Sequence, residues 1–176
     1  LKELTDKKLI YGLGISYIDG RHENCIEAIK QFPNAVIHVI NGIVHMDSLE
    51  TLAHNDLKIL VLGYKEFRRG KSLYDECGSQ IDSLKSQFYD MLPKIVNDGW
   101  FKCISFDNLA IKQLEPKRLM SEEDYDSFYM GDDGSFTMYV DAVNRQFAKS
   151  SVSTERYDLT DDITDMFKVI KDGVNG

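Results

Sequence analysis

Residues that could orient a small molecule follow four stretches of aliphatic and β-branched residues. Hydroxyl, imidazole, ammonium, guanidinium and carboxylate groups occur at these four places, and Gly42 could let a ligand approach the backbone closely. A few polar groups around an apolar wall are typical of small-molecule and cofactor sites. The candidates are Ser16, Tyr17, Asp19, Gly42, His45, Tyr64, Lys65, Arg68, Asp107 and Asn108.

The stretches that precede these candidates have the composition of buried strands. In residues 36–45, six of ten residues are β-branched aliphatics, as in a strand covered on both faces. The other predicted strands are 9–16, 58–63 and 100–106, and the predicted helices are 24–32, 46–54, a long helix from Ser79 or Asp82 to Gly99, and 109–114. Residues 64–71 are expected to form a long polar loop. This alternation predicts an α/β fold of parallel strands whose carboxyl ends bring the candidates to one edge.

The chain changes character near Met130. Before it, Ser121 and the three acidic residues that follow have the form of a capping box, which predicts a helix over 122–128. After it, turn residues separate the β-formers of 135–141 from those of 146–149, which predicts a β-hairpin. Thr160 then caps a final helix with an apolar stripe. We therefore expect an α/β body, residues 1–128, with an appended β-hairpin and C-terminal helix, residues 129–176.

Charge and cysteine content narrow the class of function. The formal net charge is −8, so general nucleic-acid binding is not expected, because such binding needs an excess of Lys and Arg; residues 68–71 are the only local basic cluster. A run of about 18 apolar residues is absent, so no membrane span is expected. Cys25, Cys77 and Cys103 lack metal-ligand spacing, which favours free thiols in the cytoplasm and no metal site.

Several of these stretches resemble one enzyme superfamily. The pattern His38-x-Ile40-x-Gly42-x-x-His45 is similar to the G-x-I-x-G-x-x-E stretch on the fifth strand of radical S-adenosylmethionine enzymes. Residues 12–19 look like the fourth strand of those enzymes, and residues 59–64 stand where the sixth would be. Residues 104–110 and 128–141 resemble phage- and prophage-associated members. The resemblance spans nearly the whole chain, as the carboxyl-terminal half of a longer protein.

This resemblance implies a partial (β/α) barrel that belongs to an iron-sulfur oxidoreductase. The complete protein would use S-adenosylmethionine and a four-iron, four-sulfur ([4Fe-4S]) cluster. By the resemblance, the residues on the cofactor side are Ser16, Ile40 and Gly42, with Tyr64 and Lys65 behind them. Those on the substrate side would be His45, Arg68, Asp107 and Asn108.

The sequence also departs from the superfamily pattern. The C-x-x-x-C-x-x-C triplet that ligates the cluster is absent, as is the G-G-E-P-type segment that would hold the methionine amino group. His38 and His45 replace the first Gly and the final Glu of the fifth-strand pattern. We therefore expect this chain to bind neither cofactor by itself and to be inactive alone. Its expected partner is a missing N-terminal half, or a second copy that associates through the open sheet edge.

A different class of protein accounts for the same strands. They could form a complete, non-catalytic small α/β module that binds a nucleotide or another protein and carries out no redox chemistry. Such a module should have a closed, well-covered sheet. A half barrel should instead have an apolar sheet edge or flank that is exposed.

Overall fold

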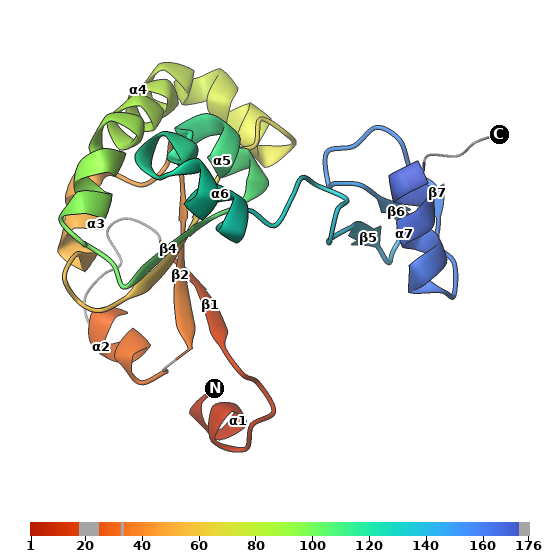
Figure 1. Cartoon of the computed structure of the whole chain (residues 1–176), viewed down its shortest axis with the longest axis horizontal. Coiled ribbons are helices and arrows are strands. Elements are labelled where there is room, and N and C mark those ends of the chain that lie inside the picture. Colours follow the sequence, from red (N-terminus) through yellow and green to blue (C-terminus); the bar gives the residue numbers. More distant parts are fainter. Residues whose placement is uncertain (18–24, 33, 173–176) are drawn as a thin grey trace. The chain divides into compact units, whose positions relative to one another are not determined.

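The computed structural model describes residues 1–17, 25–32 and 34–172. These residues form two units, 1–119 and 120–176. The first unit contains a parallel sheet with helices between its strands, and the second contains a small antiparallel sheet (Figure 1). The predicted α/β class with parallel strands is confirmed. The predicted site residue Asp19 and part of the predicted helix 24–32 lie outside the described residues.

The first unit is organised around four parallel strands. They are β1 (Leu13–Ser16), β2 (Ala35–Ile40), β3 (Lys58–Leu62) and β4 (Cys103–Phe106), and they lie side by side in chain order. Ile15, Ile37, Ile59 and Ile104 form one continuous row across the sheet. Because parallel strands all end at the same edge, the carboxyl ends of β1 to β4 and the loops after β2, β3 and β4 lie at one edge, as the sequence predicts.

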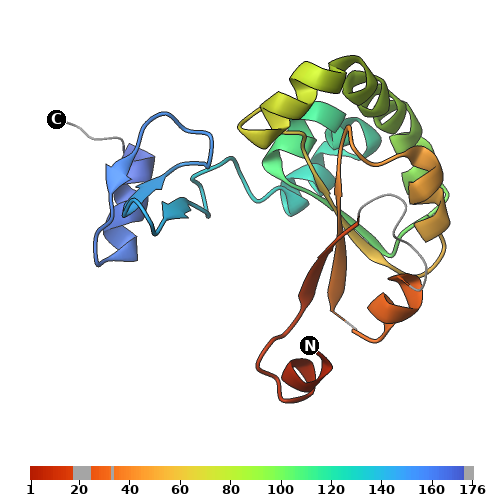
Figure 2. The same ribbon diagram turned by 180° about the vertical axis from the view of Figure 1, so that it is seen from behind.

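Helices cover one face of this sheet (Figures 1 and 2). They are α2 (Cys25–Lys30), α3 (Met46–Leu52), α4 (Arg69–Asn97) and α5 (Asn108–Leu114), with α1 (Lys2–Asp6) before β1 and the 3-10 helix η1 (Pro116–Leu119) after α5. On the covered face, Ile37, Val39, Ile59 and Val61 are at most 1% exposed and belong to one core with apolar residues of α3, α4 and α5. This face supplies most of the apolar burial of the unit.

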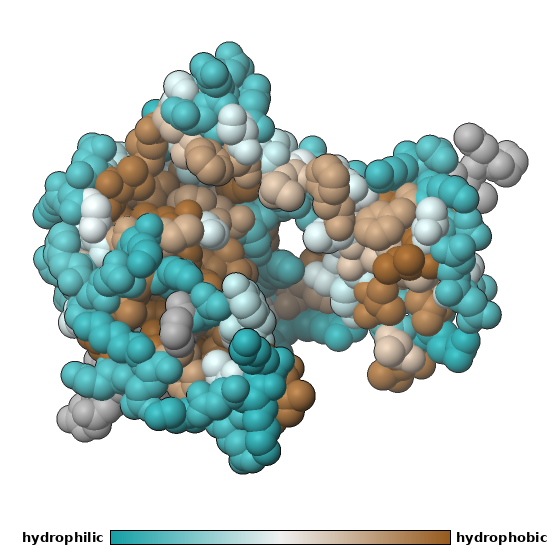
Figure 3. Space-filling view, turned by 60° about the horizontal axis from the view of Figure 1, so that its bottom comes forward, coloured by the Kyte–Doolittle hydropathy of each residue, from teal (hydrophilic) through white to brown (hydrophobic). Residues whose placement is uncertain are grey.

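The opposite face of the sheet is covered less well by the described residues. Side chains alternate along a strand, so Val36, His38 and Leu60 point away from the helices, and all three keep intermediate exposure. Ile40, at the end of β2, is 40% exposed. Apolar surface gathers in a hollow of this unit in the view of Figure 3. The predicted central strand, expected to be buried on both faces, is therefore fully buried on one face only.

The long helix α4 begins ten residues or more before the sequence indicates, at Arg69 rather than at Ser79 or Asp82. It is two helical segments joined at Cys77, whose φ of −139° and ψ of 34° are not helical. The sequence did not predict the first segment as helix because it contains Gly70 and is followed by Gly78, and glycine destabilises helix interiors. The predicted loop over 64–71 is therefore wrong for its last three residues.

The first and last predicted strands of the sheet are shorter than expected. β1 starts at Leu13, and Leu9 and Tyr11 before it are 68% and 88% exposed. β4 starts at Cys103, because the buried Trp100 donates its backbone N–H to the carbonyl of Ile95 and so closes the end of α4. Over residues 1–17, 25–32 and 34–172, no helix is both long and apolar enough to cross a membrane.

The second unit contains α6 (Glu122–Phe128), β5 (Tyr139–Asp141), β6 (Gln146–Ala148), β7 (Tyr157–Asp158) and α7 (Ile163–Asp172). Ser121 caps α6 as predicted, because its Oγ accepts a hydrogen bond of 3.1 Å from the N–H of Asp124. The predicted hairpin is present as the antiparallel pair β5 and β6. The sequence missed β7, which pairs with β6 and places Tyr157 5.4 Å from the ring of Phe147.

Candidate functional site

A pocket of about 810 Å³ lies at the carboxyl ends of β2 and β3. Its apolar wall contains Ile40 and Leu62 from the sheet, Ile43 after β2, and Phe67 and Leu73 from the chain that follows β3. Its charged lining residues are Lys65, Arg69, Glu76 and Asp107. Pockets of about 300–1,000 Å³ with an apolar wall and a few polar groups are typical of small-molecule sites. We name it the carboxyl-edge pocket.

The carboxyl-edge pocket brings together four of the nine site residues that the resemblance implies. Ile40, Tyr64, Lys65 and Asp107 all line it. Ser16 lies at the end of β1 on the less covered face, where its register partner is His38. β1, β2 and β3 are neighbouring parallel strands, and Ser16, Gly42 and Tyr64, which the sequence predicts at one edge, lie at or within two residues after their carboxyl ends.

The remaining implied residues lie outside the pocket lining. Gly42 is buried behind it: a Cβ on this glycine would stand 3.0 Å from Cγ2 of Ile81 on α4, and its φ is +86°. His45 is exposed at the start of α3, and Asn108 is the first residue of α5. Arg68 is exposed, immediately precedes α4 and stacks on Phe67 with 5.3 Å to the ring centroid.

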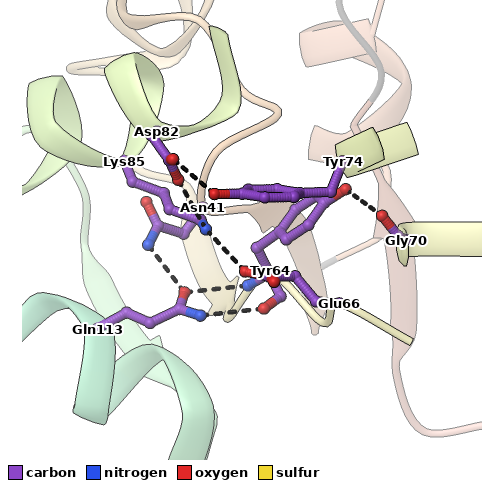
Figure 4. Close-up of polar contacts among 8 residues, drawn as sticks. All are labelled: Asn41, Tyr64, Glu66, Gly70, Tyr74, Asp82, Lys85 and Gln113. Atoms are coloured by element: carbon purple, nitrogen blue, oxygen red, sulfur yellow. Dashed lines mark hydrogen bonds and ion pairs between the residues drawn. The ribbon is translucent and has the colours of Figure 1, made fainter. Parts of the chain in front are cut away.

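A hydrogen-bond network beneath the pocket fixes the ends of β2 and β3 (Figure 4). Gln113 on α5 donates from Nε2 to the carbonyl of Tyr64 at 3.0 Å, and its Oε1 accepts from the N–H of Tyr64, also at 3.0 Å. The same Oε1 accepts a hydrogen bond of 2.9 Å from Nδ2 of Asn41, which is fully buried after β2. Asn41 Oδ1 has no partner among the described residues. The sequence analysis missed both amides, because they are 72 positions apart.

A second cluster holds the first segment of α4 against the pocket (Figure 4). The hydroxyl of Tyr64 donates to the carbonyl of Gly70 at 2.6 Å, and the hydroxyl of Tyr74 donates to Asp82 Oδ2, also at 2.6 Å. The ammonium group of Lys85 lies 5.0 Å from the ring centroid of Tyr64 and 5.2 Å from that of Tyr74. It also pairs with Asp82 at 3.2 Å and with Glu66 at 3.5 Å. We name Tyr64, Tyr74, Asp82 and Lys85 the tyrosine–lysine latch.

The latch shifts the pKa values of its members. Burial raises the pKa of Tyr64 above its ordinary value. The hydrogen bond to Asp82 raises the pKa of Tyr74 to about 12, since it stabilises the neutral phenol beside a carboxylate. The same bond is the main reason that the pKa of Asp82 is lowered, and Lys85 adds to it. The pKa shifts of Tyr74 and Asp82 are those expected of a structural contact between a phenol and a carboxylate.

Asp107 has a clear structural role at the pocket edge. Its Oδ1 accepts a hydrogen bond of 2.7 Å from the N–H of Ala110, which caps the start of α5. The same oxygen accepts a bond of 2.9 Å from the N–H of Gly63, directly after β3. Asp107 therefore ties β3 to α5 whether or not it also contacts a ligand.

The described residues contain no group of three His, Cys, Asp or Glu side chains that could hold a metal ion. The cysteines with described side chains, Cys77 and Cys103, lie on α4 and β4. A [4Fe-4S] cluster needs several thiolates at one place, so the residues present do not fit it. Ile40, Ile43 and Leu62 form an apolar wall of the carboxyl-edge pocket beside its polar side chains.

The fold and the pocket define the chain as an α/β protein with a ligand-sized site at the carboxyl edge of a four-stranded parallel sheet. Comparison with protein-family models, with curated proteins and with solved structures found no match to it.

Proposed function

We propose that this chain is the carboxyl-terminal portion of a radical S-adenosylmethionine-like iron-sulfur oxidoreductase and forms one side of a partial (β/α) barrel. The observation that carries the proposal is the strand order: β1, β2, β3 and β4 are parallel and adjacent in chain order, with helices on one face. In a (β/α) barrel the strands also follow chain order and the helices lie outside. In the doubly wound alternative, helices cover both faces.

The less covered sheet face supports the same proposal. Val36, Leu60 and Leu62 are apolar residues that keep intermediate exposure on it, and Ile40 is 40% exposed. A barrel interior would enclose these side chains once the strands that precede them in the complete protein were present. The partner of this face is therefore the missing N-terminal half or, in its absence, a second copy of the chain.

Within this proposal, the carboxyl-edge pocket receives the adenosine part of S-adenosylmethionine. Ile40 would contact the adenine ring, Lys65 would face its polar groups, and Tyr64 would close the pocket floor. Ser16 would contact the cofactor from the end of β1, outside the pocket lining. Gly42 acts from behind, because its missing side chain lets Ile81 of α4 pack against the end of β2. His45, Arg68, Asp107 and Asn108 remain on the proposed substrate side, near the same edge.

In this proposal, a segment of the complete protein outside these 176 residues would ligate the cluster. The iron-sulfur cluster and S-adenosylmethionine supply the redox chemistry, and the strands of this chain supply binding and orientation. We therefore propose that the 176-residue chain is inert alone.

The upstream coding sequence tests this proposal directly. We expect it to encode a C-x-x-x-C-x-x-C triplet in frame with Leu1. Anaerobic reconstitution with iron and sulfide should give the longer protein bound iron and a broad visible absorption, and should give the 176-residue chain neither. A start codon next to Leu1, or cluster binding by the short chain, contradicts the proposal.

A matched pair of variants tests the pocket in the longer protein. Ile40 and Val96 are both exposed aliphatics, at 40% and 42%, but only Ile40 lines the pocket. Ile40→Asp should weaken binding of S-adenosylmethionine by roughly tenfold or more, since it puts a charge on the apolar wall. Val96→Asp should leave binding unchanged. Equal effects of the two variants on binding would show that the cofactor does not bind in this pocket.

The second candidate is a complete α/β module that binds a nucleotide or another protein. The observation that favours it is the carboxyl-edge pocket itself, whose volume of about 810 Å³ lies within the range of small-molecule sites. The solution mass separates the candidates, because an exposed apolar sheet face promotes self-association. Light scattering at high concentration should show dimers or larger species for a half barrel, and a monomer for the module.

A further inference from the structure

The segment of residues 65–76, which we name the flap, forms the outer part of the carboxyl-edge pocket. It follows Tyr64 and contains the first segment of α4. Its apolar side chains Phe67 and Leu73 line the pocket and are 47% and 39% exposed. Ile40, also exposed, lines the same pocket from the sheet. Three large apolar side chains thus meet at one hollow, where a ligand could cover them.

Two fixed points bracket the flap. At its start, the backbone of Tyr64 is held by both polar atoms of the Gln113 amide. At its end, Cys77 departs from helical geometry and Gly78 follows it, so the helix is interrupted where the flap joins the rest of α4. Beyond this break, Ile81 and Phe88 are at most 2% exposed and belong to the buried face of α4. The break therefore separates a surface segment from a buried one.

The flap itself has little buried surface. Ten of its twelve residues are exposed, and the other two, Gly70 and Tyr74, have intermediate exposure. The tyrosine–lysine latch holds the flap through these two residues and through Glu66, since Tyr64 bonds to Gly70, Tyr74 bonds to Asp82, and Lys85 pairs with Glu66 at 3.5 Å. A segment held by a few polar contacts and few apolar ones opens at a lower free energy than the core.

We propose that residues 65–76 are a hinged flap that turns about Tyr64 and Cys77, and that closes Phe67 and Leu73 over the apolar part of a pocket ligand. The tyrosine–lysine latch is its resting attachment. Gly70 is required in that state, because a Cβ there would collide with the carbonyl oxygen of Lys65. The flap acts on the pocket of the proposed function, but neither its hinge nor its latch depends on which cofactor binds.

Hydrogen exchange on the 176-residue chain tests the hinge without any cofactor. A negative result would therefore contradict the flap and would leave the proposed function untouched. Amides of residues 69–76 should exchange roughly tenfold or more faster than those of 81–92. Tyr74→Phe and Gly70→Ala should each speed exchange in 69–76 further and leave 81–92 unchanged. Tyr125→Phe, in the second unit, is the control and should change neither.

Equal hydrogen-exchange protection of residues 69–76 and 81–92 would contradict the proposal of a hinged flap. Latch variants that speed exchange equally in both segments would also contradict it, because the break at Cys77 would then not separate the two segments. Closure is tested with 1-anilinonaphthalene-8-sulfonate, an aromatic probe, which should slow exchange in 69–76. A Phe67→Ser/Leu73→Ser double variant should lose this protection, whereas Val96→Ser should keep it. If the probe does not slow exchange in residues 69–76 of the unmodified chain, the proposed closure is wrong.

Discussion

The imidazole of His38 on β2 lies across Gly14 on β1, so that a methyl group on Gly14 would stand 2.6 Å from Cε1 and 2.9 Å from Nε2 of the ring. The two residues are on the less covered face of the sheet. His38 is in register with Ser16 on one side and Leu60 on the other. An imidazole therefore occupies the middle of the face that we propose to line a barrel interior, and it fits there because its neighbour is glycine.

Gly14→Ala should displace the His38 ring. The new methyl group would overlap the ring at a distance that real Cβ contacts do not reach, and the ring can swing toward the less covered side. We expect changed imidazole resonances for His38 and unchanged ones for His45 and His54, measured by NMR. Stability should fall by less than about 1 kcal/mol, because the site is not enclosed. Unchanged His38 resonances would contradict this placement.

Two isoleucines on the same strand test which sheet face is buried. Ile37 is 1% exposed beneath the helices, whereas Ile40 is 40% exposed at the pocket. Ile37→Ala should lower the free energy of unfolding by about 2–5 kcal/mol, since it leaves a cavity in the core. Ile40→Ala should cost less than about 1 kcal/mol. Urea unfolding followed by the fluorescence of Trp100, the single tryptophan, measures both. Similar losses for the two variants would contradict the burial described here.

The buried amide pair predicts a second stability difference. Gln113→Ala would leave the fully buried Asn41 without its partner and would release the backbone of Tyr64. We expect a loss of about 1–3 kcal/mol, because a buried amide without a hydrogen bond is costly. Gln87→Ala is the matched control, since Gln87 is exposed on α4 and bonds only to Ser83 among the described residues. It should cost less than about 0.5 kcal/mol. An equally small loss for Gln113→Ala would show that the network does not hold β2 and β3.

The sequence predicted the sheet because the signal for buried parallel strands is local. Four of the six residues of 35–40 are β-branched aliphatics, and four of the five residues of Lys58–Leu62 are aliphatic. Parallel strands end at one edge, so the common location of Tyr64 and Asp107 follows from composition alone. The cap of Ser121 on α6 was predictable for a similar reason, since capping residues lie within three positions of each other.

The parts that the sequence did not predict depend on contacts between distant residues. The first segment of α4 contains Gly70 and reads as loop, yet Tyr64 and Tyr74 hold it in place. β7 is only two residues long and forms by pairing with β6. The close approach of Ile81 on α4 to Gly42 was not predicted either, because the sequence around a glycine does not tell which helix will pack against it.

The latch gives the flap a pH dependence whose sign follows from Asp82. Its pKa is lowered in the folded chain by the Tyr74 hydrogen bond and by Lys85. The contribution to flap attachment is therefore present above the ordinary carboxyl pKa of about 4 and is lost as the pH falls through the lower folded value. The pKa of Tyr74 is raised to about 12 in the folded chain. Its contribution to flap attachment is therefore fully present below about pH 10 and is lost as the pH rises through about 12.

Flap protection should thus be constant between about pH 5 and 9 and should fall on either side of that range. Hydrogen-exchange protection factors for residues 69–76, corrected for intrinsic exchange rates, measure it. Asp82→Asn should abolish the loss at low pH, because the asparagine has no proton to gain, and should weaken protection at neutral pH. Asp75→Asn is the control, since Asp75 is exposed and pairs with Lys71 on the flap itself. If the loss at low pH persists in Asp82→Asn and disappears in Asp75→Asn, Asp82 does not hold the flap.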